Sequence, residues 1–192
     1  MRQAIVLPLL FLGVVNIFYL LVFLPWFARK KKLNLGREPF SHLGSRADTS
    51  RSFSKILSMA LILQYLFFLG LIQVIPVPMA AVFVLTVAAF SGIFPAFFSS
   101  KNSFWVHTIF GLTAIFGSFL GGLIINLHSP VKSIGLVANF IMLIGFIYSY
   151  YKKFIDRTAR DFNCVGELII FSGISLWNLI YFLYAISKLL YG

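Results

Sequence analysis

The sequence predicts an all-α polytopic membrane protein, a bundle of six transmembrane helices in a single domain over residues 1–192. The first observation is composition, since 60% of the residues are hydrophobic and only 11% are charged. The second is a set of runs without any charged side chain, which cover residues 3–28, 56–100, 102–131, 133–151 and 168–187. A helix needs about 20 mainly apolar residues to cross a hydrocarbon core of roughly 30 Å. The chain supplies that length several times.

The first span is predicted over residues 4–28. Its apolar run continues through Phe27 and ends in four basic residues, Arg29 to Lys32. This run is longer than the core of a signal peptide and lacks a cleavage site of small residues. We therefore expect the first helix to be retained.

The 45-residue run between Lys55 and Lys101 is too long for one span. Pro76-Val77-Pro78 lies near its middle, and proline both ends a helix and extends the residue before it. The run therefore predicts two helices, and the full set of later spans is 55–75, 79–99, 104–127, 131–151 and 165–189. An even number of spans places both termini on one side of the membrane.

Lysine and arginine are distributed unevenly between the two faces. The first loop, 29–55, carries eight, the third loop has Lys101, and the fifth loop has four. The opposite face has only Arg2, Lys132 and Lys188. The positive-inside rule then predicts cytoplasmic odd loops and external termini, in the cell (inner) membrane. Topology thus explains the net charge of +11, and we expect no nucleic-acid partner.

Two patterns predict contacts between helices. Gly117 and Gly121 form a small-xxx-small pair that permits close approach of two helix backbones. Amide side chains inside the predicted spans are expected to bridge helices rather than bind a substrate. They are Asn16, Gln64, Asn126, Asn139 and Asn178.

Ionisable residues within a membrane usually mark function, and this sequence has almost none. Glu167, at the inner end of the sixth span, is the one candidate. It could bind a proton or a cation, but an interfacial carboxylate stabilised by the helix dipole is the favoured interpretation.

The histidines and the serine beside one of them do not form a recognisable catalytic or metal site. His107 and His128 are 21 residues apart on one predicted helix, about 31 Å, so they cannot share one metal ion. His42 and His107 could meet near Cys164, but their spacing matches no zinc signature. Ser41-His42 lacks the Gly-x-Ser-x-Gly elbow of a hydrolase. We predict no catalytic residue, no metal and no cofactor.

Three short motifs remain: Pro39-Phe40-Ser41-His42-Leu43-Gly44, then Gly92-Ile93-Phe94-Pro95, then His107. With these motifs the chain resembles the six-helix membrane family called domain of unknown function 998, which is distantly similar to the Frag1/DRAM membrane proteins. The resemblance implies a basic residue before the last helix, here Arg157, and a tryptophan within it, here Trp177. Asp156-Arg157 departs from the Glu-Arg more usual in that family.

On the predicted topology the matched residues gather at one membrane face, where they could form a polar pocket. Gly44 and Pro95 would set backbone turns there, and polar side chains would bind a phosphate or carboxylate headgroup. The candidate ligand-binding residues are Ser41, His42, Gly44, Phe94, Pro95, His107 and Arg157. The alternative is structural, with these motifs capping and ending helices.

The leading functional hypothesis is a noncatalytic module that binds a lipid or a hydrophobic small molecule. Its expected partners are membrane lipids, including anionic headgroups, and a homo-oligomer or another membrane protein is left open. The first alternative is a membrane enzyme acting on a lipid headgroup or isoprenoid through His42, His107 and nearby carboxylates. A small transporter is the third hypothesis, disfavoured by the scarcity of buried charge.

Overall fold

In the computed structural model of the chain, the first span is a continuous helical rod. It comprises α1 (Arg2–Phe18), the π-helical turn η1 (Tyr19–Phe23) and α2 (Leu24–Lys30). The structure describes residues 2–35, 38–40, 42–46, 48–93, 104–156 and 164–191.

The remaining described elements are also helical. They are α3 (His42–Ser45), α4 (Ser50–Leu71), α5 (Met79–Ile93), α6 (Phe104–Leu127), α7 (Lys132–Tyr150) with the π-turn η3 (Tyr151–Ile155), and α8 (Cys164–Tyr191). Five of the described helical segments are long and apolar enough to cross a membrane, and α5 is a shorter apolar helix. The prediction of an all-α integral membrane bundle is confirmed.

Some predicted helix boundaries agree with the structure and others do not. Residues 104–127 coincide with α6, and the Pro76-Val77-Pro78 break separates α4 from α5 as predicted. The predicted second span, 55–75, is displaced, because α4 begins at Ser50 and ends at Leu71. A polar first turn extends α4 beyond the apolar run, and Val74 N–H bonds to Leu71 O in a tighter turn that ends it. Positions 94–99 of the predicted third span lie outside the described residues.

The π-helical turn in the first rod has an identifiable cause in Pro25. Proline has no backbone N–H, and its ring would contact the carbonyl four residues earlier in a regular α-helix. Here Leu24 N–H reaches back five residues to Tyr19 O, which widens the turn ahead of Pro25. The span therefore stays helical through a proline.

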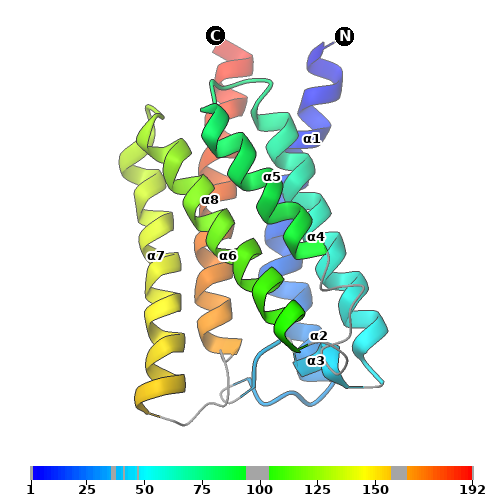
Figure 1. The fold of residues 1–192 in the computed structure, drawn as a ribbon. Coiled ribbons are helices and arrows are strands. Elements are labelled where there is room, and N and C mark those ends of the chain that lie inside the picture. The colour runs from blue at the N-terminus through cyan, green and yellow to red at the C-terminus, as the bar shows by residue number, and fades with distance from the viewer. Residues whose placement is uncertain are drawn as a thin grey trace.

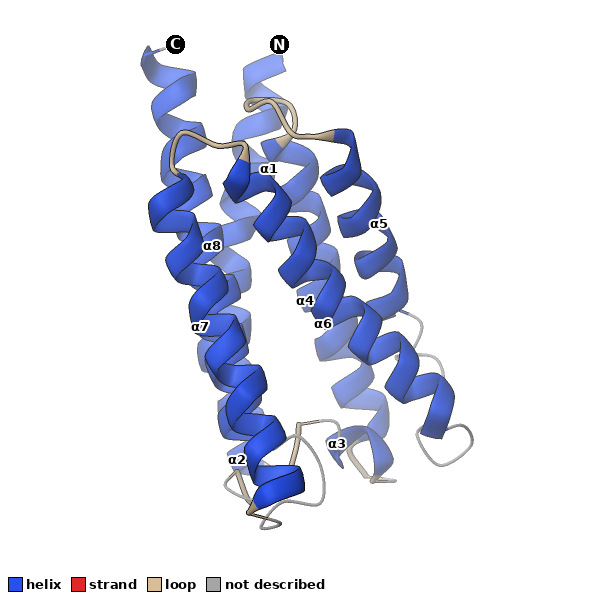
Figure 2. Cartoon of the chain, turned by 60° about the vertical axis from the view of Figure 1, so that its left-hand side comes forward, coloured by secondary structure: helices blue, strands red, loops and turns tan. Residues whose placement is uncertain are grey.

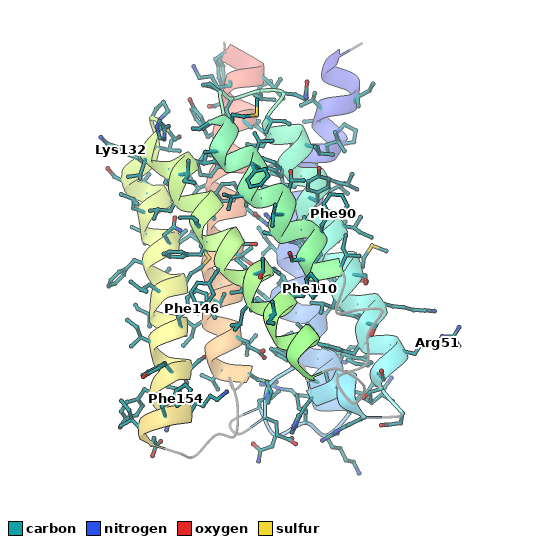
Figure 3. All side chains as sticks on the ribbon, viewed as in Figure 1. Arg51, Phe90, Phe110, Lys132, Phe146 and Phe154 are labelled. Atoms are coloured by element: carbon teal, nitrogen blue, oxygen red, sulfur yellow. The ribbon has the colours of Figure 1, made fainter. Side chains whose placement is uncertain are left out.

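The long helices form a ring in which each contacts the next, in the order α1, α4, α5, α6, α7, α8 and back to α1. Both termini lie at one end of this ring, and the loop carrying α3 lies at the other (Figure 1). We call these the terminal end and the basic end. Lys132 and Arg51 mark the two ends in Figure 3.

Glycines set the closest helix contacts. A Cβ added to Gly117 would lie 2.7 Å from Ala88 Cβ, and one at Gly121 would overlap Leu85, so the predicted small-residue face of α6 packs against α5. Gly173 makes a second contact of this kind, which was not predicted from the sequence. A Cβ on Gly173 of α8 would lie 2.7 Å from the carbonyl oxygen of Ala138 on α7.

Two hydrophobic clusters fill the bundle. The cluster toward the terminal end includes Phe67, Trp177 and Tyr181, whose rings contact one another edge-on or tilted. The cluster at the basic end includes Phe27, Leu33 and Leu43, so the first loop contributes to the core.

Candidate functional site

The first loop begins with a tight helix end. Leu33 N–H bonds to Ala28 O at 3.0 Å and Lys32 N–H bonds to Arg29 O at 2.9 Å, the paired bonds of a Schellman motif. Lys32 adopts the left-handed conformation this motif requires, with φ of 55°. Glycine usually occupies that position, because a side chain there costs roughly 1–2 kcal/mol. The chain thus places a strained lysine where it turns back toward the bundle.

Hydrogen bonds to the last helix then hold the loop in place. Cys164 N–H donates to Glu38 O at 2.9 Å, and Phe40 N–H donates to the Glu167 carboxylate at 2.7 Å. The Phe40 side chain is only 2% exposed and stacks on Phe171 of α8, with ring centroids 6.1 Å apart. Glu167 therefore has a role that neither sequence interpretation anticipated, because it accepts a backbone donor from a loop 127 residues earlier in the chain.

The end of the loop is held by a buried hydroxyl. Thr49 Oγ1–H donates to Leu43 O at 2.5 Å, and both residues are fully buried. This bond ties the short helix α3, which includes Gly44, to the start of α4. Thr49 occupies the N-cap position of α4, but its side chain makes no capping bond. Its hydroxyl orders the loop instead.

Glu38 is the centre of a small charged cluster on the loop. Its carboxylate accepts the Asn34 backbone N–H at 2.8 Å and lies 3.2 Å from His42 Nδ1 and 3.6 Å from Arg46 Nη2. Because a carboxylate only accepts hydrogen bonds, His42 Nδ1 carries the proton in this pair. The Asn34 N–H, His42 and Arg46 together hold the pKa of Glu38 below its usual range, against partial burial, which raises it. Arg46 also donates to Lys31 O at 3.0 Å.

Exposed basic side chains surround this folded loop, and we call them the basic rim. They are Arg29, Lys30, Lys32, Arg51 and Lys55. Among the described residues, none of the five forms an ion pair. The carboxylate of Glu38 on the same loop pairs with His42 and Arg46 instead. Lys30 Nζ instead lies 5.0 Å from the ring centroid of Trp26, which is 51% exposed. The rim thus presents positive charge that remains available to a partner.

The predicted ligand-binding set is described only in part. Ser41, Phe94, Pro95 and Arg157 lie outside the described residues. Gly44 is in α3 and His107 is in the first turn of α6. The structure brings His42 together with Glu38 and Arg46, two residues that the sequence analysis did not select. Glu38 is four residues before His42 and Arg46 is four residues after it, and this spacing was the sequence feature that could have indicated the cluster.

The predicted amide bridges are present, in two separate clusters. In the first, which we call the amide trio, Asn16 of α1 donates to Gln64 Oε1 of α4 at 2.7 Å. Gln64 and Asn178 of α8 bond reciprocally through both amide groups, at 2.9 and 2.8 Å. Three helices therefore meet through their amides inside the bundle.

The second cluster is centred on Asn126 of α6. Its Oδ1 accepts Trp177 Nε1–H at 3.1 Å and Tyr181 O–H at 2.8 Å, and its Nδ2 donates to Asn139 Oδ1 on α7. Asn139 Nδ2 donates in turn to Phe119 O at 3.0 Å. This cluster joins α6, α7 and α8 and confirms the expected bridging role.

Comparisons with known proteins found no match for this chain. No family model, no curated protein and no solved structure matches the chain. The resemblance to domain of unknown function 998 stays a prediction. Within the part of the chain that the structure describes, no group of three potential metal-ligating side chains is found.

Proposed function

We propose that this chain is a noncatalytic membrane module that binds anionic lipid headgroups at its basic end. The observation that carries the proposal is the basic rim, a set of exposed cations at the end of α2, at the start of α4 and at Lys32 in the folded loop between them, which is bonded to α8. Cations held on helix ends and an ordered loop lose less conformational entropy on binding than the same charges on a flexible segment.

Electrostatics favour a headgroup over other partners. Each Lys or Arg near an anionic leaflet contributes about 1 kcal/mol of attraction. Glu38 would oppose this attraction, but Arg46 and His42 lie against its carboxylate. Lys32 supports the proposal because it keeps a strained left-handed backbone conformation at a position where glycine would be unstrained. Retaining a lysine there is consistent with a functional role for its positive charge.

Trp26 fits the rim to the level of the headgroups. Tryptophan is favoured at the boundary between hydrocarbon and water, where its ring is anchored. Trp26 is one turn from Lys30 on α2, and the two side chains are in cation–π contact. If the Trp26 ring is anchored at this boundary, the Lys30 ammonium beside it lies at the level of the lipid phosphates.

The orientation follows from the same charges. Thirteen of the sixteen basic residues belong to the loops between spans one and two, three and four, and five and six. We propose that these loops face the cytoplasm of a cell (inner) membrane, with both termini outside. Membership of the family called domain of unknown function 998 is part of the same proposal.

Lipid retention tests this function directly. The protein is reconstituted in nanodiscs of phosphatidylcholine with a minority of phosphatidylglycerol, and bound lipids are counted by native mass spectrometry after gentle release. We expect Lys30→Gln/Lys32→Gln to lower the affinity for phosphatidylglycerol about thirtyfold, because two headgroup attractions of about 1 kcal/mol each are lost.

A matched pair of lysines at the terminal end provides the control. Lys132→Gln/Lys188→Gln removes the same charge from the opposite end of the bundle and is expected to leave the retained lipid unchanged. Equal loss in both double variants, or no loss in either, would refute a headgroup site at the basic rim.

A further inference from the structure

Helices α5 and α6 form a close-packed pair. A Cβ added to Gly117 of α6 would lie 2.7 Å from Ala88 Cβ, and one added to Gly92 of α5 would lie 3.2 Å from Ala114 Cβ. Helices that approach this closely cannot tilt against each other without overlap of their atoms. The pair is therefore expected to move as one unit.

Helices α7 and α8 form a second pair of this kind, and it stays closed toward the basic end. A Cβ on Gly173 of α8 would lie 2.7 Å from Ala138 O. Gly166 is seven residues nearer the basic end, in the first turn of α8, and a Cβ there would overlap Ser149 Oγ of α7. Close contact thus continues to the start of α8.

The contact between α6 and α7, which we call the seam, changes in character along its length. Toward the terminal end it is held by hydrogen bonds, since Asn126 donates to Asn139 and also accepts bonds from α8. Toward the basic end from there, the Phe146 ring of α7 stacks on Phe116 at 4.7 Å between centroids and meets Phe119 edge-on at 6.1 Å. Ring contacts of this kind are weaker than the bonded cluster and can separate without leaving a buried donor unpaired.

Nearer still to the basic end, α6 loses close contact on its inner face. A Cβ on Gly122 would lie 3.4 Å from Trp177 Nε1, so this face of α6 packs against α8. Gly111 is about three turns away on the same face, and a Cβ there would meet nothing within 4 Å. In Figure 2, α6 and α7 are joined at the terminal end and diverge toward the basic end.

The other neighbour of the α5–α6 pair is α4, and side chains make that contact. Leu61 packs over Gly92, and the Tyr65 and Phe90 rings are tilted at 6.2 Å between centroids. Packed side chains of this kind accommodate small sliding motions of whole helices.

We propose that the α5–α6 pair pivots at the Asn126 cluster and swings away from the α7–α8 pair toward the basic end. In the closed state, which the structure shows, Phe146 contacts Phe116 and Phe119. In the open state these rings separate, while the contacts within each helix pair and the hydrogen bonds of Asn126 remain. The motion involves none of the residues of the basic rim.

Distances between spin labels test the motion in the wild-type background. Pairs of introduced cysteines are labelled in lipid nanodiscs and measured by double electron–electron resonance. Ile109→Cys/Ile147→Cys crosses the seam on the basic side of the ring contacts, and Leu127→Cys/Ile147→Cys crosses it on the terminal side with one label in common. The three side chains are 58–60% exposed, whereas the native Cys164 is fully buried. Protein without added cysteines gives the background label.

Two distances are expected for the pair at 109 and 147, and a single narrow distance for the pair at 127 and 147. Equal widths in the two pairs would overturn the proposal, because both sides of the seam would then be equally fixed.

A variant then tests the ring contacts as the element that holds the seam closed. Phe116→Ala removes the stacked pair and should raise the ratio of the long to the short distance about fivefold in the 109–147 pair. Phe182→Ala is the control, since it removes an edge contact with Phe11 between α1 and α8 and should leave that ratio unchanged. An unchanged ratio in folded Phe116→Ala, or an equal rise in both variants, contradicts the proposal. If Phe116→Ala does not fold, the wild-type distances decide.

Discussion

The two amide clusters of this bundle differ in how completely their polar atoms are bonded. Around Asn126 both amides are buried, and each of their oxygens and nitrogens has a partner on another residue. In the amide trio Asn16 Oδ1 is unpaired, and Gln64 is half-buried although it faces inward. The two clusters have similar side chains, because each is built around neutral amides in spans without charged residues. The two clusters therefore differ in the degree of hydrogen bonding and not in the kind of side chain.

The packing around each cluster reinforces this difference. Gly135 leaves room for the Asn126 side chain, and Trp177 and Tyr181 close the space beside it. On the same face of α6, about three turns nearer the basic end, a Cβ added to Gly111 would meet nothing within 4 Å. A fully bonded, close-packed cluster holds three helices together, whereas the trio joins three helices and leaves one buried acceptor without a partner.

The largest effect should come from Asn126→Leu. This change leaves the buried Trp177 N–H and Tyr181 O–H without an acceptor and should cost about 3 kcal/mol of stability. Asn16→Leu removes an oxygen that has no partner and one bond to Gln64 Oε1, which still accepts from Asn178, and should cost less than about 1 kcal/mol. Thermal unfolding in detergent, followed by tryptophan fluorescence, measures both. Equal losses in the two variants would break the distinction between the clusters.

The next effect concerns the glycine contacts. Gly173→Ala places a methyl group against Met142 and the Ala138 carbonyl, and overpacking of this kind should cost about 2 kcal/mol. Gly111→Ala is the matched control, because its methyl group meets open space and alanine favours a helix by up to about 1 kcal/mol. The thermal midpoints should therefore move in opposite directions. A loss of stability in Gly111→Ala would show that α6 and α8 are close there.

Glu38 tests how firmly the first loop is held at the basic end. Its folded-state pKa is lowered, so its charge contributes stability above the unfolded pKa, and that stability is lost as the pH falls through the folded pKa. Glu38→Gln should lower stability by about 1 kcal/mol at neutral pH, and the difference should vanish once the pH has fallen below the lowered pKa of Glu38. Thermal midpoints of both proteins across this range provide the measurement. A difference that persists at the acidic limit would assign the effect to packing rather than charge.

The smallest effect is expected from Lys32→Gly. Glycine adopts the left-handed conformation without the side-chain penalty, but it also gains freedom in the unfolded chain, so the net stabilisation should be about 0.5 kcal/mol. Lys32→Gln removes the same charge and retains the strain. Hydrogen exchange of the Leu33 amide, whose N–H closes the Schellman motif, should slow in Lys32→Gly alone. Slower exchange in both variants would attribute it to charge.

Local chemistry explains which features were predictable. The bounds of α6, the break at Pro76-Val77-Pro78 and the close packing of Gly117 and Gly121 each depend on residues near in sequence. The bridging role of the amides was also predictable, because a buried amide in a membrane needs a partner on another helix.

Other features depended on segments far apart in the chain. Nothing near Glu167 indicates that it would receive the Phe40 N–H, because the two residues are 127 positions apart. The contact of Gly173 with α7 likewise needed the relative positions of two helices, although small residues recur on both. Of the predicted site residues, the structure places Gly44 and His107 on helices and shows side-chain contacts for His42, which lies with Glu38 and Arg46, two residues outside the predicted set.

The sequence by itself determined that this protein is a helical membrane bundle with most of its basic charge at one end, because hydrophobic length and charge position act locally along the chain. The tertiary structure alone decided which polar groups are satisfied. Asn16 and Asn126 are both asparagines in apolar helices, and their different surroundings come from the side chains that neighbouring helices place against them. Hydrogen bonding between helices depends on three-dimensional geometry, and that geometry leaves one amide oxygen free inside the bundle.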